Sequence, residues 1–431
     1  MKRDQLSARI GNFDVSGEGR VSQLKLSSTE KNRPFGPPPS PASRSQSKRR
    51  RAARTRAAAI QALILAAIIA VVLAFFATVW GGLQRHGIGF SLDFLKQPAG
   101  FDISEGLTVA KGPHGLSLVP FNSQQTYAQA LIAGLYNTLV VTLISIVLAT
   151  VVGVLVGVGR MSRNWVVKNW AWAFVELIRN TPLLIQIIFW YFAVLLQLPS
   201  LSDATLLHGA LIASRQGVFT PWLIATPAAS RYAWIAGLAV AVFAVGVLVR
   251  TRGQRRLAFA VSAGILALGV AVAGRPFSID MPQASAFSVS GGAGFSPEMA
   301  ALIIGLSVNF AAYVAEVVRG SVQSIDRGQW EAAAALGLGH RESLWVVVLP
   351  QAVRVILPSL GNLYVTIAKS TSFAIAIGFP DMFSVYGTVA NQTGRALEGI
   401  IIVMVVYMLI SLSISAIANL YNRRVMKKGA R

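Results

Sequence analysis

Long stretches without charged residues dominate this chain and restrict what it can fold into. About 20 consecutive apolar residues are enough to cross the hydrocarbon core of a membrane as a helix. We predict eight such spans, at about 57–80, 130–158, 170–198, 232–249, 257–273, 298–318, 355–379 and 397–420. Only 13% of the residues are charged, roughly half the share in an ordinary soluble domain. The sequence therefore predicts an all-α polytopic membrane protein with about eight transmembrane helices.

The basic residues fall mainly on one side of these predicted spans. Lys and Arg number 39 against 17 Asp and Glu, which gives a net charge of +22. With eight spans, the segments on the side of the two termini hold 30 of the basic residues, and the opposite loops hold 7. Because loops rich in Lys and Arg stay in the cytoplasm, we expect both termini to be cytoplasmic.

Residues 1–56 have the composition of a disordered basic cytoplasmic tail. They hold 14 Lys and Arg but only 4 Asp and Glu, and too few apolar residues to build a core. We interpret the following span, 57–80, as an uncleaved anchor helix, because so long a polar segment precedes it. The tail has two aromatic residues, Phe13 and Phe35, so we expect it to attract membrane lipid and not nucleic acid. A second basic tail is expected at 421–431.

The sequence offers little that would support catalysis. It has no cysteine and only four scattered histidines, so we propose no metal site. It also lacks the Gly-x-x-x-x-Gly-Lys-Ser/Thr loop that cradles nucleotide phosphates, which predicts a protein that is not an enzyme and holds no cofactor. The alternative is an ion-coupled secondary transporter that acts alone. Such a carrier would need an acidic relay, and Glu176 and Glu316, which fall within or at the edge of the predicted spans, are few for that purpose.

The most informative segment is the predicted cytoplasmic loop 328–350. Strong helix formers run from Glu331 to Leu336, and Gly337 and Gly339 then interrupt them. A second apolar stretch follows, which we expect Pro350 to close. This pattern predicts two short helices that meet at a bend. Apolar faces on a loop exposed to water indicate docking into the groove of a soluble partner.

This loop resembles the signature of ATP-binding-cassette importer permeases. The signature reads Glu-Ala-Ala, three residues, Gly, nine residues, an aliphatic residue, one residue, Leu-Pro, and this chain has Val347 at the aliphatic position. The resemblance implies that the segment docks a cytoplasmic ATPase subunit, which binds the ATP, and passes its movement to the membrane helices. The residues to which it assigns this coupling role are Glu331, Ala332, Ala333, Gly337, Leu338, Leu349 and Pro350.

Further motifs resemble the polar and general L-amino acid permeases within that superfamily. They are Leu349-Pro-Gln-Ala-Val-Arg354, Lys369-Ser-Thr-Ser372 and Arg179-Asn-Thr-Pro-Leu-Leu-Ile-Gln186. The resemblance implies a bacterial inner-membrane protein that pairs with an identical or homologous second permease. It also implies a periplasmic amino acid binding protein as a partner, and alternating access as the mechanism.

The resemblance divides the chain into a five-helix permease core and additions to it. The core has two parts, 130–198 and 298–420, and the segment 199–297 between them holds an extra transmembrane hairpin. Importers of general L-amino acids share such an insertion. Asn180 replaces the glycine of the family's motif, which is a conservative change if its backbone is left-handed.

Polar residues inside the predicted spans are candidates for the translocation path. They are Asn309, Lys369, Thr371, Ser372, Glu176 and Arg179. Two interpretations stay open for Glu176 and Arg179, which lie three residues apart: an ion pair within one helix, or contact with the charged groups of an amino acid. Asn309 and the hydroxyl groups could likewise bond a neighbouring helix. The Gly153-x-x-x-Gly157 pair predicts close helix packing.

Overall fold

The computed structural model describes residues 56, 59–75, 77–78, 81–82, 90–112, 115–206, 211–248, 252–285 and 288–428. The chain forms two units, Met1–Gly89 and Phe90–Arg431. In the first unit, the apolar helix Ala59–Phe75 lies within the predicted anchor span 57–80. The predicted N-terminal tail, apart from Arg56, lies outside the described residues.

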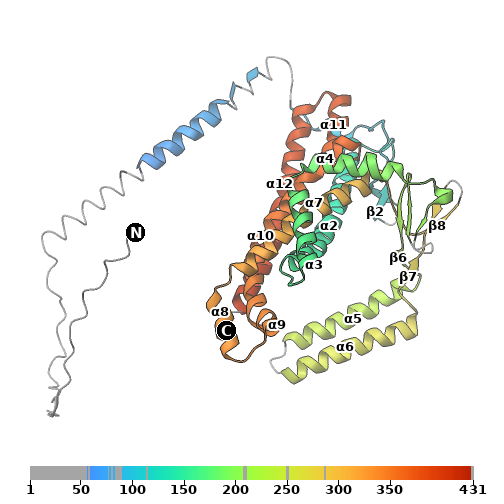
Figure 1. The fold of residues 1–431 in the computed structure, drawn as a ribbon. Coiled ribbons are helices and arrows are strands. Elements are labelled where there is room, and N and C mark those ends of the chain that lie inside the picture. The colour runs from blue at the N-terminus through green and yellow to red at the C-terminus, as the bar shows by residue number, and fades with distance from the viewer. Residues whose placement is uncertain are drawn as a thin grey trace, which may run out of the picture. The chain divides into compact units, whose positions relative to one another are not determined.

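Six helices in the described residues are long and apolar enough to cross a membrane. They are α2 (Tyr127–Arg160), α5 (Ala229–Leu248), α6 (Arg252–Ala273), α7 (Pro297–Gln323), α10 (Leu349–Ser370) with the turns around it, and α12 (Ala396–Lys428). A bent helix pair raises the number of spans to seven, and Ala59–Phe75 adds a shorter apolar helix. The prediction of a polytopic helical membrane protein is thus confirmed (Figure 1). The last helix continues through 421–428, where we expected a tail.

The predicted third span, 170–198, is not one helix. It consists of α3 (Trp165–Arg179) and α4 (Leu183–Ile188), the latter extended by η2 (Phe189–Val194) and η3 (Leu195–Gln197), and the two parts are bent by 103°. The break lies next to Pro182, which disfavours helical backbone in the residue before it. The side-chain amide of Gln186 donates hydrogen bonds to the carbonyls of Ile178 and Thr181, at 2.8 and 2.9 Å. These bonds satisfy carbonyl groups that the break leaves without helical partners.

Short β-strands, which we did not predict, occupy the loops of the second unit. β1 (Leu107–Gly112) and β2 (Gly115–Pro120) form a hairpin before α2. The inserted segment carries a four-stranded sheet of order β10-β5-β4-β3 and two strand pairs, β6-β7 and β8-β9. Their bounds are β3 Thr205–Leu206, β4 Leu211–Ser214, β5 Gly217–Thr220, β6 Trp222–Ala225, β7 Phe277–Asp280, β8 Gln283–Ala284, β9 Val289–Ser290 and β10 Ala293–Phe295. All of these strands are antiparallel.

Helix α7 is the centre of the core, and α2 packs closely against it (Figure 1). A Cβ atom at Gly153 would lie 2.5 Å from Cβ of Val314, and one at Gly157 would lie 2.9 Å from the carbonyl oxygen of Ala315. The predicted close packing at this glycine pair is confirmed, because any side chain there would push the two helices apart.

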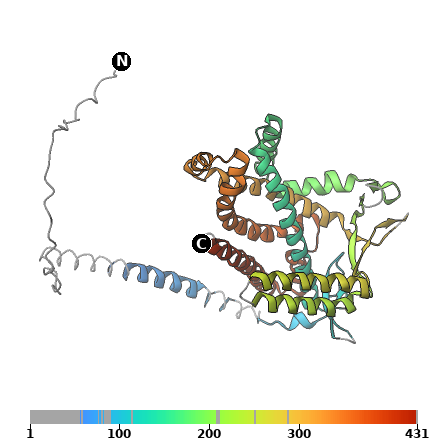
Figure 2. The ribbon, with the colours of Figure 1, turned by 90° about the horizontal axis from the view of Figure 1, so that it is seen from below.

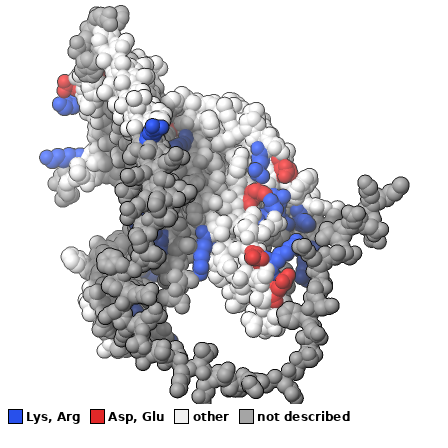
Figure 3. Space-filling model, turned by 90° about the vertical axis from the view of Figure 1, so that its left-hand side faces the viewer, with Lys and Arg blue, Asp and Glu red and all other residues white. Residues whose placement is uncertain are grey.

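The inserted helices α5 and α6 lie side by side in both views (Figures 1 and 2) and contact one another. The hydroxyl of Tyr232 on α5 donates to the carbonyl of Leu266 on α6 at 3.0 Å. Only 11% of the residues in the apolar window of each helix are buried, against 72% for α7. On the face drawn in Figure 3, uncharged areas lie between a cluster of charged side chains of both signs and the other, scattered charged side chains. Exposed apolar surface of this kind is what lipid covers.

The remaining helices of the second unit are short. They are η1 (Asp93–Lys96), η4 (Leu201–Asp203), α8 (Arg327–Ala335), α9 (His340–Glu342), η6 (Ser343–Val348), η7 (Thr371–Ile377) and α11 (Met382–Thr393). Helices α8, α9 and η6 connect α7 to α10, while η7 and α11 connect α10 to α12. The first connection contains most of the residues assigned to coupling, and the second begins with Thr371 and Ser372.

Candidate functional site

The loop 328–350 folds into two helical segments separated by a sharp turn, as we predicted. Helix α8 starts after Asp326, whose carboxylate accepts a hydrogen bond from the backbone N–H of Gly328 at 3.0 Å. At its other end the N–H of Leu338 donates to the carbonyl of Ala333 at 3.1 Å. Gly337 has a φ of +79°. This is the left-handed end of a helix, which favours glycine because other residues meet steric resistance there.

The second helical segment does not close at Pro350, contrary to our expectation. Helices α9 and η6 run directly into α10, so that His340–Ile377 is one apolar span. Pro350 lies in the first turn of α10. The i→i+5 hydrogen-bonded turn η6 precedes it, and such turns relieve a helix whose regular bonding is interrupted.

Three large apolar side chains of this connection are exposed. Leu336 at the end of α8 is 82% exposed, and Trp345 and Val346 of η6 are each 67% exposed. Of the residues assigned to coupling, Ala333 is buried. Leu338 and Leu349 are half-buried, and the others, Glu331, Ala332, Gly337 and Pro350, are exposed. The segment therefore presents both apolar surface and a fixed bend to whatever binds it.

Glu316 joins α7 to the end of α2. Its carboxylate forms ion pairs with Arg160, the last residue of α2, and with Arg319, whose Nε lies 3.3 Å from Glu316 Oε2. Glu316 and Arg319 lie three residues apart on α7, so they form an ion pair within one helix. Because Arg160 shares the carboxylate, the pair also fixes α2 against α7.

The equivalent pair on α3 is not formed. Glu176 accepts a hydrogen bond from the side-chain amide of Asn180 at 3.3 Å, and the guanidinium carbon of Arg179 lies 5.4 Å from the ring centroid of Tyr313 on α7. The first of the two interpretations, an ion pair between Glu176 and Arg179, is therefore wrong, and a cation–π contact holds Arg179 instead. Asn180 has a φ of −87°, so it caps α3 without the left-handed backbone that would make it equivalent to glycine.

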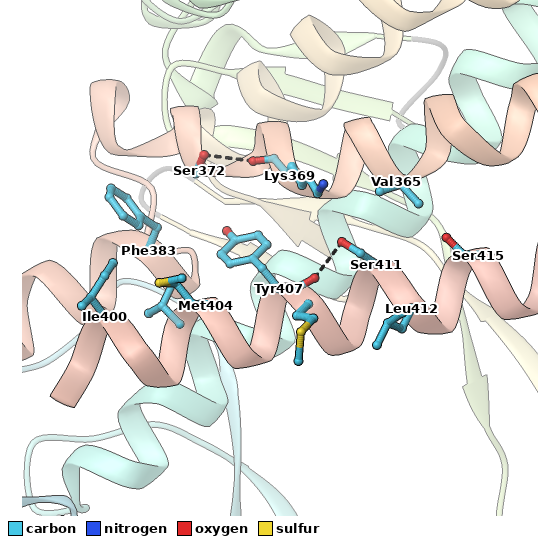
Figure 4. A pocket seen from close by; sticks show the side chains of 12 residues that line it. Val365, Lys369, Ser372, Phe383, Ile400, Met404, Tyr407, Ser411, Leu412 and Ser415 are labelled. Carbon is cyan, nitrogen blue, oxygen red and sulfur yellow. Dashed lines mark hydrogen bonds between the residues drawn. The ribbon is translucent and has the colours of Figure 1, made fainter. Parts of the chain in front are cut away.

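A cavity of about 670 Å³ lies between α10 and α12 and contains two candidates for the translocation path (Figure 4). Lys369 lines it from the end of α10 and Ser372 from the start of η7, and Tyr407, Ser411 and Ser415 line it from α12. The rest of the wall is apolar and consists of Val365, Phe383, Ile400, Val403, Met404, Met408 and Leu412. One cation and several hydroxyl groups in an apolar wall are suited to a small polar ligand.

The other two polar candidates lie outside this wall. Thr371 is fully buried, and its hydroxyl donates to the carbonyl of Ala368 at 2.9 Å and lies 3.3 Å from the hydroxyl of Tyr407. Asn309 is 4% exposed within α7 and is not among the lining residues. Lys369, Thr371 and Ser372 therefore form one group where α10 ends and η7 begins, and Asn309 is separate from it.

Two buried acidic residues escaped the sequence analysis. Asp381 is fully buried; its carboxylate accepts hydrogen bonds from the N–H of Ser384 at 2.9 Å, which caps α11, and from the hydroxyl of Tyr407 at 3.1 Å. Glu398 is 1% exposed and pairs with Arg395 at 3.0 Å. Asp381 follows the end of a predicted span, and the N-cap preference of Asp before a helix was the signal that could have identified it.

Within the described residues, no three His, Asp or Glu side chains lie close enough together to hold a metal ion. The polar groups that line the cavity at Lys369 are one ammonium group and several hydroxyl groups. Such groups can bind and orient a small polar molecule.

Comparison with known proteins identifies relatives along most of the chain. The chain is 37% identical over 376 residues to the amino-acid ABC transporter permease protein YhdX of Escherichia coli, which covers 85% of this chain and 93% of that protein. It is 36% identical to the general L-amino acid transport system permease protein AapQ of Rhizobium johnstonii, over 80% of this chain and 85% of that one. Among solved structures, a chain in the crystal structure of an amino acid ABC transporter with histidines aligns with a TM-score of 0.44 and 23% identity, over 69% of this chain and 95% of that one.

A family model covers the region that contains both candidate sites. Residues 149–427 match the binding-protein-dependent transport system inner membrane component. This range includes the bend at Gly337, the exposed apolar residues of η6 and the cavity between α10 and α12. The chain therefore belongs to the family of binding-protein-dependent transport system inner membrane components, the permease subunits of ATP-binding-cassette transporters.

Proposed function

We propose that this permease imports polar or general L-amino acids by alternating access, and that a separate cytoplasmic ATPase powers it. The observation that carries the proposal is the connection between α7 and α10, where a bend fixed by Gly337 lies between α8 and the exposed side chains Trp345 and Val346. This arrangement is suited to a groove on a partner. Relatives along most of the chain are named as amino-acid permeases, which supports the substrate class.

The coupling would pass from this connection to the membrane helices along two routes. On one side η6 continues into α10, which carries Lys369 at the cavity wall. On the other side Trp330 of α8 packs against the apolar cluster of Val318 and Val322 on α7. A partner that moves α8 would therefore move both helices, as an interface-driven rearrangement requires.

The substrate would pass the wall that contains Lys369 and Ser372. The ammonium group of Lys369 can pair with the α-carboxylate that every amino acid carries, and hydroxyl groups such as that of Ser372 accept from its α-ammonium group. The apolar remainder of the wall leaves side-chain specificity broad. This is in keeping with a separate periplasmic binding protein that selects the amino acid.

The proposal assigns the partners and the orientation as well. Both termini are cytoplasmic, because 30 basic residues fall on that side against 7 opposite. The matching family of inner membrane components supports a place in the bacterial inner membrane. A second permease, identical or homologous, completes the pathway. The sequence lacks a phosphate-binding loop, so the ATP is bound by the ATPase subunits and this chain holds no cofactor.

The test is the pair of substitutions Gly337→Val and Gly339→Val. Valine at position 337 must take a φ near +79°, which costs about 1–3 kcal/mol, whereas Gly339 has a φ of −62° that valine adopts freely. We expect Gly337→Val to insert and pair normally but to lose co-purification of the ATPase and uptake of labelled amino acids into vesicles. Gly339→Val should keep both. Normal docking and uptake in Gly337→Val would refute the assignment of this bend as the coupling element.

A further inference from the structure

A second cavity, of about 820 Å³, lies where three helices of the membrane domain meet. Arg160 lines it from the end of α2, Lys168 from the start of α3 and Arg319 from near the end of α7. Membrane-crossing helices end at the boundary between hydrocarbon and water. The cavity therefore lies at the depth of the lipid headgroups.

The charges around this cavity do not balance. Arg160 and Arg319 share the single carboxylate of Glu316, so two cations face one anion. Lys168 adds a third cation, and no ion pair of Lys168 is found among the described residues. No acidic residue is among those that line the cavity. The cavity thus has a net positive charge that an anion would neutralise.

Aromatic side chains complete the wall. Trp172 of α3 and Trp330 of α8 line the cavity, and the ring of His340 stacks on Trp330 with centroids 5.0 Å apart. Trp165 and Trp170 on the same helix as Trp172 are 74% and 75% exposed. Tryptophans with this exposure collect at the headgroup level of a membrane. Both the charge and the aromatic rings therefore indicate a ligand from the membrane interface.

We propose that this cavity binds a phosphate group, and that the phosphate belongs to the headgroup of an anionic phospholipid. Basic pockets between membrane helices are suited to such headgroups, and Lys and Arg bind phosphate through charge-assisted hydrogen bonds. The bound phosphate lies between α3 and Trp330 of α8. The phosphate group fixes the connection between α7 and α10 on the side that faces the membrane. This role does not depend on which partner docks on the opposite side.

The test uses the full chain, with the subunits that co-purify with it, in nanodiscs of equal parts phosphatidylglycerol and phosphatidylcholine. Native mass spectrometry then counts the lipids that remain bound. Wild-type protein should retain phosphatidylglycerol in preference to phosphatidylcholine. Lys168→Gln should lower the ratio of the two about fivefold, the factor expected for one lysine at an anionic membrane surface.

Arg163→Gln is the matched control, because it removes the same charge from an exposed position between α2 and α3 that does not line the cavity. This variant should keep the wild-type ratio. Equal losses in the two variants, or no preference in the wild type, would overturn the proposal. Retention of phosphatidylglycerol only in the absence of the ATPase would also overturn the proposal, because the ATPase would then occupy the cavity in the assembled transporter.

A second arm separates the two sources of phosphate. Nanodiscs of phosphatidylcholine alone are incubated with inorganic phosphate, and bound phosphate is measured for the wild type and for Lys168→Gln. Phosphate that binds weakly, and fails to displace phosphatidylglycerol in the mixed nanodiscs, supports a lipid headgroup. Displacement of the lipid by inorganic phosphate, lost in Lys168→Gln, would keep the phosphate site but overturn the lipid as its source.

Discussion

The hydroxyl of Tyr407 donates a hydrogen bond to the carboxylate of Asp381 at 3.1 Å. Tyr407 lines the cavity between α10 and α12, and Asp381 caps α11. Thr371 lies 3.3 Å from the same hydroxyl. The phenol group of Tyr407 therefore links the wall of the proposed path to Asp381, the buried N-cap of α11. Loss of a hydrogen-bond donor to a buried carboxylate lowers the free energy of unfolding.

The first prediction concerns this phenol. Tyr407→Phe keeps the ring but leaves the buried Asp381 carboxylate without one donor, which should cost about 1–3 kcal/mol of unfolding free energy. The measurement is the thermal unfolding midpoint of the detergent-purified chain. Tyr421→Phe is the control, because Tyr421 is 57% exposed, and it should be neutral. Unchanged midpoints in both variants would show that the hydrogen bond contributes nothing.

The second prediction tests the contact between α2 and α7. Gly153→Ala places a Cβ atom 2.5 Å from that of Val314, so the helices must separate, at a cost of about 1–3 kcal/mol. Gly264→Ala in α6 has nothing within 4 Å of the added atom and should be neutral or slightly stabilising, because alanine is the better helix former. Thermal unfolding compares the two. Equal stability would mean that α2 and α7 can shift apart without penalty.

Some parts of the fold and site were readable from the sequence because a single residue type decides the local backbone or packing. The turn at Gly337 and the close approach at Gly153 are of this kind, since each depends on the absence of a side chain. The long apolar helices were equally clear, because their length alone separates them from soluble helices.

Other parts depend on contacts between distant segments and left no local pattern. The bend at Pro182 is hidden within the apolar run 170–198, and the strands of the insertion, two to four residues long, are too short to show an alternating pattern. Arg179 contacts Tyr313 of α7 and does not pair with Glu176, its neighbour on α3. The cavity at Lys369 needs Tyr407 from another helix. Spacing along one helix could not reveal any of these partners.

The third prediction follows from Glu105, which precedes β1 and lies outside the membrane-spanning helices. Burial raises the pKa of its carboxyl, and the nearby charge of Glu298 raises it further. Because the pKa is raised in the folded state, protonated Glu105 contributes favourably to the stability of the fold. This contribution is complete at a pH below the pKa of the unfolded chain, and it is lost as the pH rises through the pKa of the folded state. Ionised Glu105 therefore weakens the folded state at neutral pH.

Glu105→Gln should accordingly be more stable than the wild type at neutral pH, since glutamine keeps an acceptor for the hydroxyl of Ser296 without ionising. The difference should shrink as the pH falls and vanish below the ordinary value of 4.5. Thermal unfolding across this pH range provides the measurement. Glu331→Gln, at an exposed position, should show no such trend, and a constant difference for Glu105→Gln would argue against the pKa shift.

The last prediction is that the inserted helices α5 and α6 are dispensable for transport. They bury little of their surface, and the polar hydroxyl of Tyr232 is satisfied between them. The dispensable part is smaller than the whole inserted segment 199–297. Val218 and Phe295 of the four-stranded sheet pack on the core cluster, and Ser296 caps α7.

The strands β6 and β7 provide a precise site for the deletion. Ala225 pairs with Phe277 at their ends, so residues 226–276 can be replaced by Asn-Gly, the preferred two-residue hairpin turn. Removing two helices keeps the orientation of every later span. We expect this deletion to retain most of the wild-type uptake, while deletion of 199–297 should lose assembly through exposure of the core. A well-assembled 226–276 deletion without transport would place α5 and α6 in the pathway or in a required subunit contact.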